Sequence, residues 1–205
     1  MTSPKRLIVI PIIACAAIAN LGGQARPAGP AQENTAGYQE LDDFSGERSS
    51  LGTAWEGFSD RVMGGVSELR SQVLTEEAHR YLRISGTVST RNNGGFIQVR
   101  LMLGSDFSPF DGSRFRGVRV VVRGTGDAYF LHLRTAGMML PWKYYAAPVG
   151  VTAAWTAVDI PWSAFEKGDF GTMGKLNPSR LKSIAVVAAK KDFDALIDVR
   201  EIGFY

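Results

Sequence analysis

Apolar and polar residues alternate along most of the sequence after residue 80, and this pattern constrains the fold more than any other feature. A period of two places successive side chains on opposite faces of a β-strand. The alternating stretches are 82–88, 97–103, 118–123, 129–134, 155–160, 184–187 and 196–205. After residue 25, no stretch keeps an apolar stripe of helical period for three turns, and the best helical segment is a single turn around Trp162–Phe165. The pattern predicts an all-β antiparallel sandwich.

Turn-forming residues separate several of these strands. Asn92–Gly95 and Gly124–Asp127 are rich in residues that tolerate positive φ, so hairpin-type connections are predicted there. No internal repeat or interior linker interrupts the sequence, which predicts a single β-sandwich domain over residues 38–205. Trp155 and Trp162 are expected to anchor the core of this sandwich or its rim.

The N-terminal segment has the three parts of a secretory signal peptide. Met1–Arg6 is positive, Leu7–Leu21 is mostly apolar, and Gly23–Ala25 has small residues at the positions that a signal peptidase reads. We therefore expect a signal peptide over residues 1–25 and a flexible leader over 26–37, and hence an exported protein, periplasmic or secreted from the cell. The apolar run is shorter than the ~20 residues of a transmembrane helix, so no membrane span is expected in the mature form.

Two alternatives remain open for this segment. Ile12–Cys15 resembles a bacterial lipobox, in which Cys15 would be lipidated and would anchor the protein as a lipoprotein. The segment is also compatible with an uncleaved signal anchor. Cys15 is the only cysteine of the chain, which excludes an internal disulfide, and its removal would leave a mature protein without a thiol.

The charge balance excludes two classes of partner. The chain has 23 basic and 20 acidic residues, but Lys5 and Arg6 lie in the expected signal peptide, which has no acid. Without those two residues the chain has 21 basic and 20 acidic residues, a net charge of +1. So small an excess gives no electrostatic basis for binding nucleic acid or an anionic membrane surface.

Few side chains are candidates for catalysis. His79 lies in the polar segment Glu76–Arg80 and is expected in a solvated loop. His132 lies on the polar face of a strand beside Arg134, where it either lines a ligand surface or faces water. The chain offers no acid–base pair that can be located, so neither enzymatic activity nor a cofactor is expected.

No metal site is predicted either. Asp42 and Asp43 are neighbours whose side chains would point to opposite faces of a strand, so they cannot act as a carboxylate pair. Together with Asp198 they are candidate ligands for a structural Ca²⁺, but no Asp-rich loop accompanies them. The chain also lacks a cluster of Cys and His residues that could bind zinc.

Polar side chains of the alternating strands are expected on one or both outer faces of the sandwich. These are Gln98, Arg100, Arg119, Arg123, His132 and Arg134. With nearby aromatic residues they form the candidate ligand- or partner-binding set of Arg100, His132, Arg134, Trp142 and Tyr144. Planar polar groups beside aromatic platforms suit saccharide rings or a carboxylated ligand. The alternative is a solvated sheet face, which carries the same kinds of residue.

One segment places two glycines inside an apolar stretch. It consists of Asp60, Arg61, Val62, Met63, Gly64, Gly65, Val66 and Ser67. Within a strand, such glycines indicate a bulge or a close approach of backbone; alternatively they relieve the geometry of a strand near a core tryptophan. This segment closely resembles the signature of the complex I intermediate-associated protein 30 family. The resemblance continues in order through Gly94–Phe96, Phe110–Asp111, Gly117–Gly124, Tyr129–Thr135 and Ile160–Phe165, and covers about residues 44–205.

The resemblance implies both a fold and a role. The fold is a galactose-binding-domain-like jelly roll, similar to that of carbohydrate-binding modules. Mitochondrial members of the family act as chaperones in the assembly of respiratory complex I, whereas this chain begins with a secretion signal rather than a transit peptide. We therefore expect a non-enzymatic, extracytoplasmic protein-binding domain, an assembly or chaperone factor with an unidentified protein partner. The alternative is a carbohydrate- or polymer-binding module with a saccharide ligand.

Overall fold

The computed structural model describes residues 37–140, 142–168 and 174–205. The expected signal peptide, Cys15 and the leader up to residue 36 lie outside the described residues, so these predictions stay predictions. No helix among the described residues is long and apolar enough to cross a membrane. The regular helical segments there are short 3₁₀ turns: η1 (Asp60–Met63), η2 (Arg91–Asn93), η3 (Trp162–Ala164) and η4 (Pro178–Arg180).

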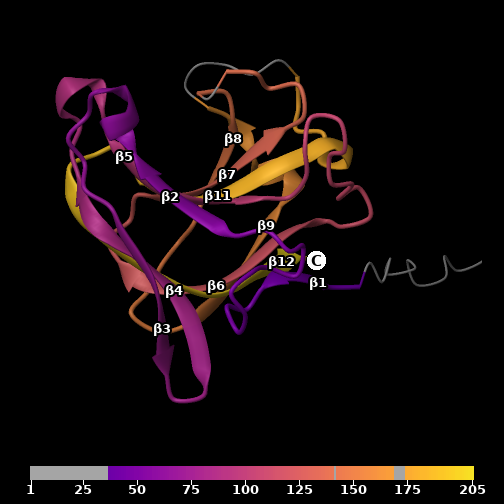
Figure 1. Ribbon diagram of the computed structural model, residues 1–205, viewed down its shortest axis with the longest axis horizontal. Coiled ribbons are helices and arrows are strands. Elements are labelled where there is room, and N and C mark those ends of the chain that lie inside the picture. The colour runs from indigo at the N-terminus through magenta and orange to yellow at the C-terminus, as the bar shows by residue number, and fades with distance from the viewer. Residues whose placement is uncertain (1–36, 141, 169–173) are drawn as a thin grey trace, which may run out of the picture. The chain divides into compact units, whose positions relative to one another are not determined.

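The predicted all-β antiparallel sandwich is confirmed. Sheet A contains β1 (Gln39–Asp42), β3 (Arg70–Glu76), β4 (His79–Val88), β6 (Gly117–Thr125), β9 (Thr156–Pro161) and β12 (Phe193–Phe204). Sheet B contains β2 (Trp55–Ser59), β5 (Phe96–Met102), β7 (Tyr129–Thr135), β8 (Tyr145–Pro148), β10 (Glu166–Lys167) and β11 (Leu181–Ala189). Figure 1 looks along the two layers, with β2, β7, β8 and β11 above β3, β4, β6 and β12.

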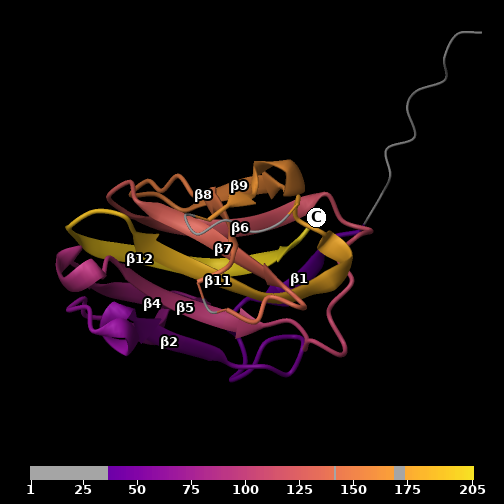
Figure 2. The same ribbon diagram turned by 90° about the horizontal axis from the view of Figure 1, so that it is seen from above.

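Strand order places the longest strands in the middle of each sheet. Sheet A runs β3-β4-β12-β6-β9, and β1 pairs with the second half of β12 where β4 has ended. Sheet B runs β10-β8-β7-β11-β5-β2, and Figure 2 shows its larger strands in this order from β8 to β2. The central strand β11 therefore has β5 on one side and β7 on the other.

The core lies between the sheets and follows the alternation of the sequence. Leu101 of β5, Leu131 of β7 and Ile184 of β11 point inward from sheet B and are fully buried. Ile84 and Ile197 of sheet A are buried against the same core. Burying a side chain of this size stabilises the fold by about 1.5–3 kcal/mol.

The predicted turns form, but they are not hairpins. Asn92, Asn93 and Gly126 all have positive φ, as their residue types predicted. Residues 92–95 connect β4 of sheet A to β5 of sheet B, and residues 124–127 connect β6 of sheet A to β7 of sheet B. Turn residues indicate where the chain reverses, whereas pairing between distant segments decides which sheet the next strand joins.

Two other expectations are corrected. Trp155 lies on the outer face of sheet A rather than in the core, with the guanidinium carbons of Arg123 and Arg200 4.4 and 5.1 Å from its ring centre. Trp162 is at the rim of the core, as expected: its indole N–H donates to the Phe115 carbonyl at 2.7 Å. His79 begins β4 directly after a two-residue turn, whereas it was expected in a loop.

Candidate functional site

Several charged side chains on the outer face of sheet A are paired with each other. The guanidinium of Arg83 donates two hydrogen bonds to Asp198, at 2.7 and 2.8 Å, and Arg123 donates a third to the same carboxylate. Arg119 makes a similar two-bonded pair with Asp159, at 2.6 Å for both contacts. The polar groups of this face therefore brace the sheet.

The acidic residues considered for calcium are likewise in use. Two arginines neutralise Asp198, and Asp42 accepts hydrogen bonds from the Phe44 backbone and the Trp55 indole. Within residues 37–140, 142–168 and 174–205, no group of three or more His, Cys, Asp or Glu side chains is placed to hold a metal ion.

The outer face of sheet B brings the candidate binding residues together. Arg100 on β5 and His132 on β7 both pair with Ala185 on β11, so the three residues form one row across the sheet. Arg134 lies two residues beyond His132 on the same face. The ring of Tyr144 stacks on the His132 imidazole, with centres 3.9 Å apart and planes 10° apart. Arg119 and Arg123, by contrast, lie on the other sheet.

Two nitrogen atoms in this row have no hydrogen-bonding partner among residues 37–140, 142–168 and 174–205. The Nη2 of Arg100 donates to Glu56 at 2.9 Å, but its Nε is buried and makes no hydrogen bond with the described residues. The Nε2 of His132 is buried and unpaired in the same way. A buried polar group without a partner costs about 1–3 kcal/mol, and such groups in native proteins are rare enough to need a reason. The part of the chain that the structure describes offers these two atoms no hydrogen-bonding partner.

His132 is neutral at physiological pH. Burial lowers the pKa of its imidazole to about 3, and the positive charge of Lys190 acts in the same direction. A neutral imidazole has one nitrogen that donates a hydrogen bond and one that accepts it. Its unpaired Nε2 can therefore meet either a donor or an acceptor on a ligand.

Apolar residues that the sequence did not single out surround this row. Ala185, Val187 and Ala189 point outward along β11 and are covered by Phe96 and Phe130 on the neighbouring strands. The sequence feature that could have identified these residues is the nearly continuous apolar run of residues 184–189, because such a run indicates a strand that is covered on both faces. Phe58 on β2 lies under Arg100, whose guanidinium carbon is 5.0 Å from the ring centre.

Arg134 holds the segment that carries the two aromatic candidates. Its guanidinium donates to the carbonyls of Met138, Leu140 and Lys143, at 2.7, 2.9 and 3.2 Å. Trp142 and Tyr144 follow in the same segment, and 44% of the Trp142 surface is exposed. Arg134 is thus placed to position these rings, and its contribution to binding stays a prediction.

We expect Arg134→Ala to keep the sandwich folded but to lower the affinity for a ligand on this face. The variant loses three hydrogen bonds to one surface segment and none to the core, so its melting temperature should change little. Limited proteolysis should cut the variant between residues 136 and 143 faster than the wild type. A large drop in melting temperature with unchanged affinity would assign Arg134 to structure alone. Arg200→Ala, which removes a positive charge from the opposite sheet, is the control.

The segment of residues 60–67 forms a rigid turn instead of the expected strand. Asp60 is fully buried and accepts hydrogen bonds from the Ser67 backbone and hydroxyl at 2.9 and 2.5 Å, and from the Gly95 and Phe96 backbones at 2.5 and 3.3 Å. Burial alone would raise the pKa of its carboxyl, but these hydrogen bonds outweigh burial and lower it. The signature is therefore tied to Gly94–Phe96 through one carboxylate.

The glycines of the signature make room for that carboxylate. A Cβ on Gly65 would lie 2.3 Å from Asp60 Cγ, and a Cβ on Gly94 would lie 2.4 Å from its Oδ2. Of the interpretations that the sequence left open, the glycines therefore mark a close approach, although it is to a side chain and is not in a strand. The turn leaves Val62 and Met63 at its tip, 73% and 57% exposed.

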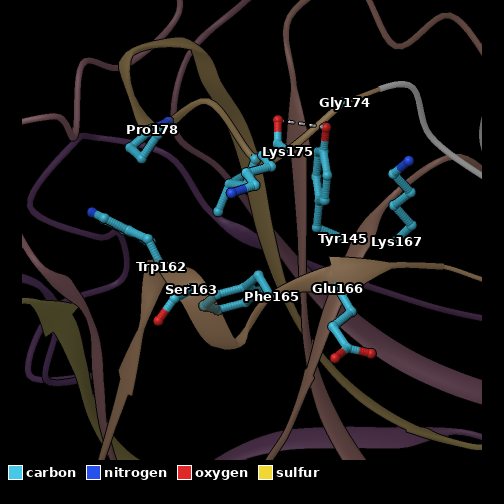
Figure 3. A pocket seen from close by; sticks show the side chains of 10 residues that line it. Tyr145, Trp162, Ser163, Phe165, Glu166, Lys167, Gly174, Lys175 and Pro178 are labelled. Atoms are coloured by element: carbon cyan, nitrogen blue, oxygen red, sulfur yellow. Dashed lines mark hydrogen bonds between the residues drawn. The ribbon is translucent and has the colours of Figure 1, made fainter.

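A separate cavity of about 660 Å³ lies beside β8, β10 and η3 (Figure 3). Its wall includes Tyr145, Trp162 and Phe165. The Tyr145 hydroxyl donates to the Lys175 carbonyl at 3.1 Å, and the Trp162 indole is bonded to Phe115. These two polar groups already bond to the protein, and the side chains of Ser163, Glu166, Lys167 and Lys175 also line the cavity.

Comparisons with known proteins agree with this architecture. The sequence model of the family described as "Complex I intermediate-associated protein 30 (CIA30)" matches residues 43–197. A search of curated proteins gave no match. Among solved structures, the chain is similar to a family 11 carbohydrate-binding module of the cellulosomal cellulase Lic26A-Cel5E of Clostridium thermocellum. The TM-score is 0.66 and the identity 16%, over 82% of this chain and 94% of that one.

Two further structures share the fold. One is the family 11 module from the same organism in complex with a β-1,3-1,4-mixed-linked tetrasaccharide, with a TM-score of 0.62 and 16% identity over 82% of this chain and 94% of that one. The other is the family 30 module of the Clostridium thermocellum cellulase Cel9D-Cel44B, with a TM-score of 0.54 and 15% identity over 75% and 91%. The family model matches residues 43–197, which is more than half of the chain. The chain therefore belongs to the complex I intermediate-associated protein 30 family.

Proposed function

We propose that this is a non-catalytic binding domain that holds a saccharide chain against the outer face of sheet B, outside the cytoplasm. The observation that carries the proposal is the row of Arg100, Ala185 and His132, with one unpaired nitrogen on each side of a small residue. Once the side chains that bury these two atoms move aside, a sugar hydroxyl can accept from the Arg100 Nε–H, and a hydroxyl can donate to the imidazole. The apolar faces of sugar rings can pack on the aromatic side chains nearby.

Two further observations support this assignment. Arg83, Arg119 and Arg123 of sheet A are paired with Asp198 or Asp159, whereas the buried side-chain nitrogens without a partner among the described residues belong to Arg100 and His132 of sheet B. A family 11 module with the same fold has been solved with a bound tetrasaccharide, although that likeness extends only to the fold. From the sequence we expected a protein-binding domain, with saccharide binding as the alternative. We now propose saccharide binding as the main function and protein binding as the second candidate.

An NMR titration tests the proposal. The ¹⁵N-labelled domain is titrated with saccharides first selected on a glycan array. Shift changes are expected at Arg100, His132 and Ala185, while residues of the outer face of sheet A, such as Ala157 on β9, stay unchanged. Failure of every saccharide to bind, or shift changes centred on sheet A, would contradict it.

The turn of residues 60–67 favours a second candidate function, which is binding of a protein partner as an assembly or chaperone factor. Val62 and Met63 are exposed on a turn that the buried Asp60 holds rigid. A rigid pair of apolar side chains is suited to a pocket on another protein because little conformational entropy is lost on binding. Crosslinking in extracts of the native host tests this, with a Val62→Ser/Met63→Ser variant expected to lose the captured protein. Equal capture by the variant would contradict it.

A further inference from the structure

We propose that the free edge of β3 pairs with the same edge of a second copy of this chain, so that sheet A continues from one molecule into the other. The proposal does not rest on saccharide binding, and it concerns a part of the molecule that the proposed function leaves unused. It comes from the unpaired backbone of one edge strand and from the order of the side chains along it.

β3 is an edge strand that lacks the usual protection of such strands. It pairs with β4 on one side, and no strand among the described residues pairs with its other side. Natural proteins keep exposed edges short or interrupt them with lysine, proline or a bulge. The seven residues of β3 include neither lysine nor proline, and their register with β4 is regular. By comparison, β10 has two residues, β9 ends at Pro161 and β2 contains Gly57.

The direction of the free backbone groups follows from the pairing with β4. Glu68 donates its backbone N–H to the Thr87 carbonyl at 2.9 Å, and the register of β3 continues this pairing without a shift. Hydrogen-bonded residues alternate along an antiparallel strand. The even-numbered residues of β3 therefore bond to β4, and the odd-numbered ones direct their N–H and C=O groups to the free edge. These are Ser71, Val73 and Thr75.

An apolar side chain is exposed at the middle of this edge. Val73 lies opposite Leu82 of β4, whose side chain is buried in the core, so both point to the inner side of sheet A. The rest of the sandwich nevertheless leaves 42% of the Val73 surface exposed. Figure 1 shows the hairpin of β3 and β4 extending away from sheet B at the bottom of the view. A strand added to this edge would cover Val73 from the side.

The residues on the free edge are complementary to themselves. When two copies of β3 run antiparallel with Val73 at the centre, Val73 faces its counterpart, and Ser71 of each copy faces Thr75 of the other. Each of these pairs can exchange two backbone hydrogen bonds, because all three residues direct their groups to the edge. Valine and threonine favour strands, and pairs of hydroxyl residues across strands stabilise a sheet. A two-fold symmetric interface needs such self-complementarity, which favours a second copy over an unrelated peptide.

The charges at the two ends of β3 fit the same register. Arg70 of one copy faces Glu76 of the other. Arg70 is exposed, and its guanidinium has no hydrogen bond or ion pair within the described part of the chain. Glu76 is bonded to Arg123 through Oε2 and interacts with Trp155, but its side chain is 48% exposed. A carboxylate has about four acceptor positions, so Glu76 can accept from Arg70 as well. A parallel pairing would instead bring like charges together.

Such a dimer has a consequence for the binding face. Side chains of paired strands keep their side of a sheet, so the inner faces of both A sheets point the same way. The two B sheets then lie on that side, and their outer faces are directed to the same side of the dimer. Two sites held in this way bind one polymer more tightly than a single site does, because the second contact is intramolecular. This consequence alone depends on the proposed function.

Analytical ultracentrifugation of the purified protein tests the proposal without a saccharide. We expect the mean mass to rise from that of the monomer toward that of the dimer between about 1 and 100 µM, as for a small, transient interface. Hydrogen exchange locates the contact. The amides of Ser71, Val73 and Thr75 should exchange at least about tenfold more slowly at the highest concentration, whereas those of Gln72 and Leu74, already bonded to β4, should not change.

Variants assign the dimer to this edge. Val73→Lys places two ammonium groups beside the two-fold axis and should weaken the dimer more than about tenfold. The matched Ala157→Lys adds a lysine to β9, the opposite edge of sheet A, and should leave the dimer unchanged. Arg70→Glu brings like charges together and should weaken it about threefold or more. All three positions are exposed, so the melting temperatures of the monomers should stay close to that of the wild type.

Three results would overturn the proposal. The first is a monomeric mass at every concentration, and the second is a dimer that Val73→Lys leaves intact. The third is pairing of this edge with an extended segment of a different protein while the chain itself stays monomeric. None of them bears on saccharide binding at sheet B, which the NMR titration measures separately.

Discussion

Asp60→Ala is expected to lower the free energy of unfolding by about 3–5 kcal/mol. The carboxylate is fully buried and accepts four hydrogen bonds, from Ser67, Gly95 and Phe96. Its removal leaves buried N–H groups without an acceptor, and each such group costs about 1–3 kcal/mol. Urea unfolding of the variant and the wild type at pH 7 measures the difference.

A control and a pH series make this test sharper. Asp111 is exposed and accepts one hydrogen bond from the Ser113 backbone, so Asp111→Ala should cost less than about 1 kcal/mol. Because the fold lowers the pKa of Asp60, its contribution is present above the pKa of an unfolded Asp, about 4, and is lost as the pH falls through the lower folded value. A loss below about 1 kcal/mol for Asp60→Ala would mean that the carboxylate does not hold the turn.

His132→Phe is expected to have the opposite effect on stability while it weakens binding. Phenylalanine keeps the stack on Tyr144 and removes a buried nitrogen that has no partner, so the free energy of unfolding at pH 7 should rise by about 1–3 kcal/mol. Affinity for the saccharide should fall about tenfold, because a hydrogen bond is lost. A residue that destabilises the free protein and strengthens binding is typical of a functional site.

The stability of the wild type should also depend on pH through His132. The unfolded imidazole binds a proton below pH 6.5, whereas the folded one stays neutral down to about 3. Stability is therefore lost as the pH falls through this window, by up to about 1.4 kcal/mol per unit. His132→Phe should lack this loss between pH 6.5 and 5, and His79→Phe, at the exposed start of β4, should keep it. If His132→Phe unfolds with the same pH dependence as the wild type, His132 is not held neutral.

The alternation of apolar and polar residues predicted which face of a strand each side chain lies on, but it did not predict which strands are neighbours in the sheet. Alternation alone placed Arg100 and His132 on the polar faces of their strands. It could not show that both strands flank β11, because that pairing joins residues more than 50 positions apart. For the same reason the bond from Gly95 to Asp60 was not foreseen, although both segments had been singled out. Small apolar residues such as Ala185 carry no chemical signal, so the middle of the row was missed.

The position of β12 has a consequence for when this protein can fold. The last strand in sequence is a central strand of sheet A, and it pairs with β1, β4 and β6. Sheet A therefore closes only after residues 193–204 have been synthesised, and β1 must wait for a partner more than 150 residues away. Contacts of such long sequence separation slow folding. Sheet A thus stays incomplete until its last strand, β12, has been synthesised.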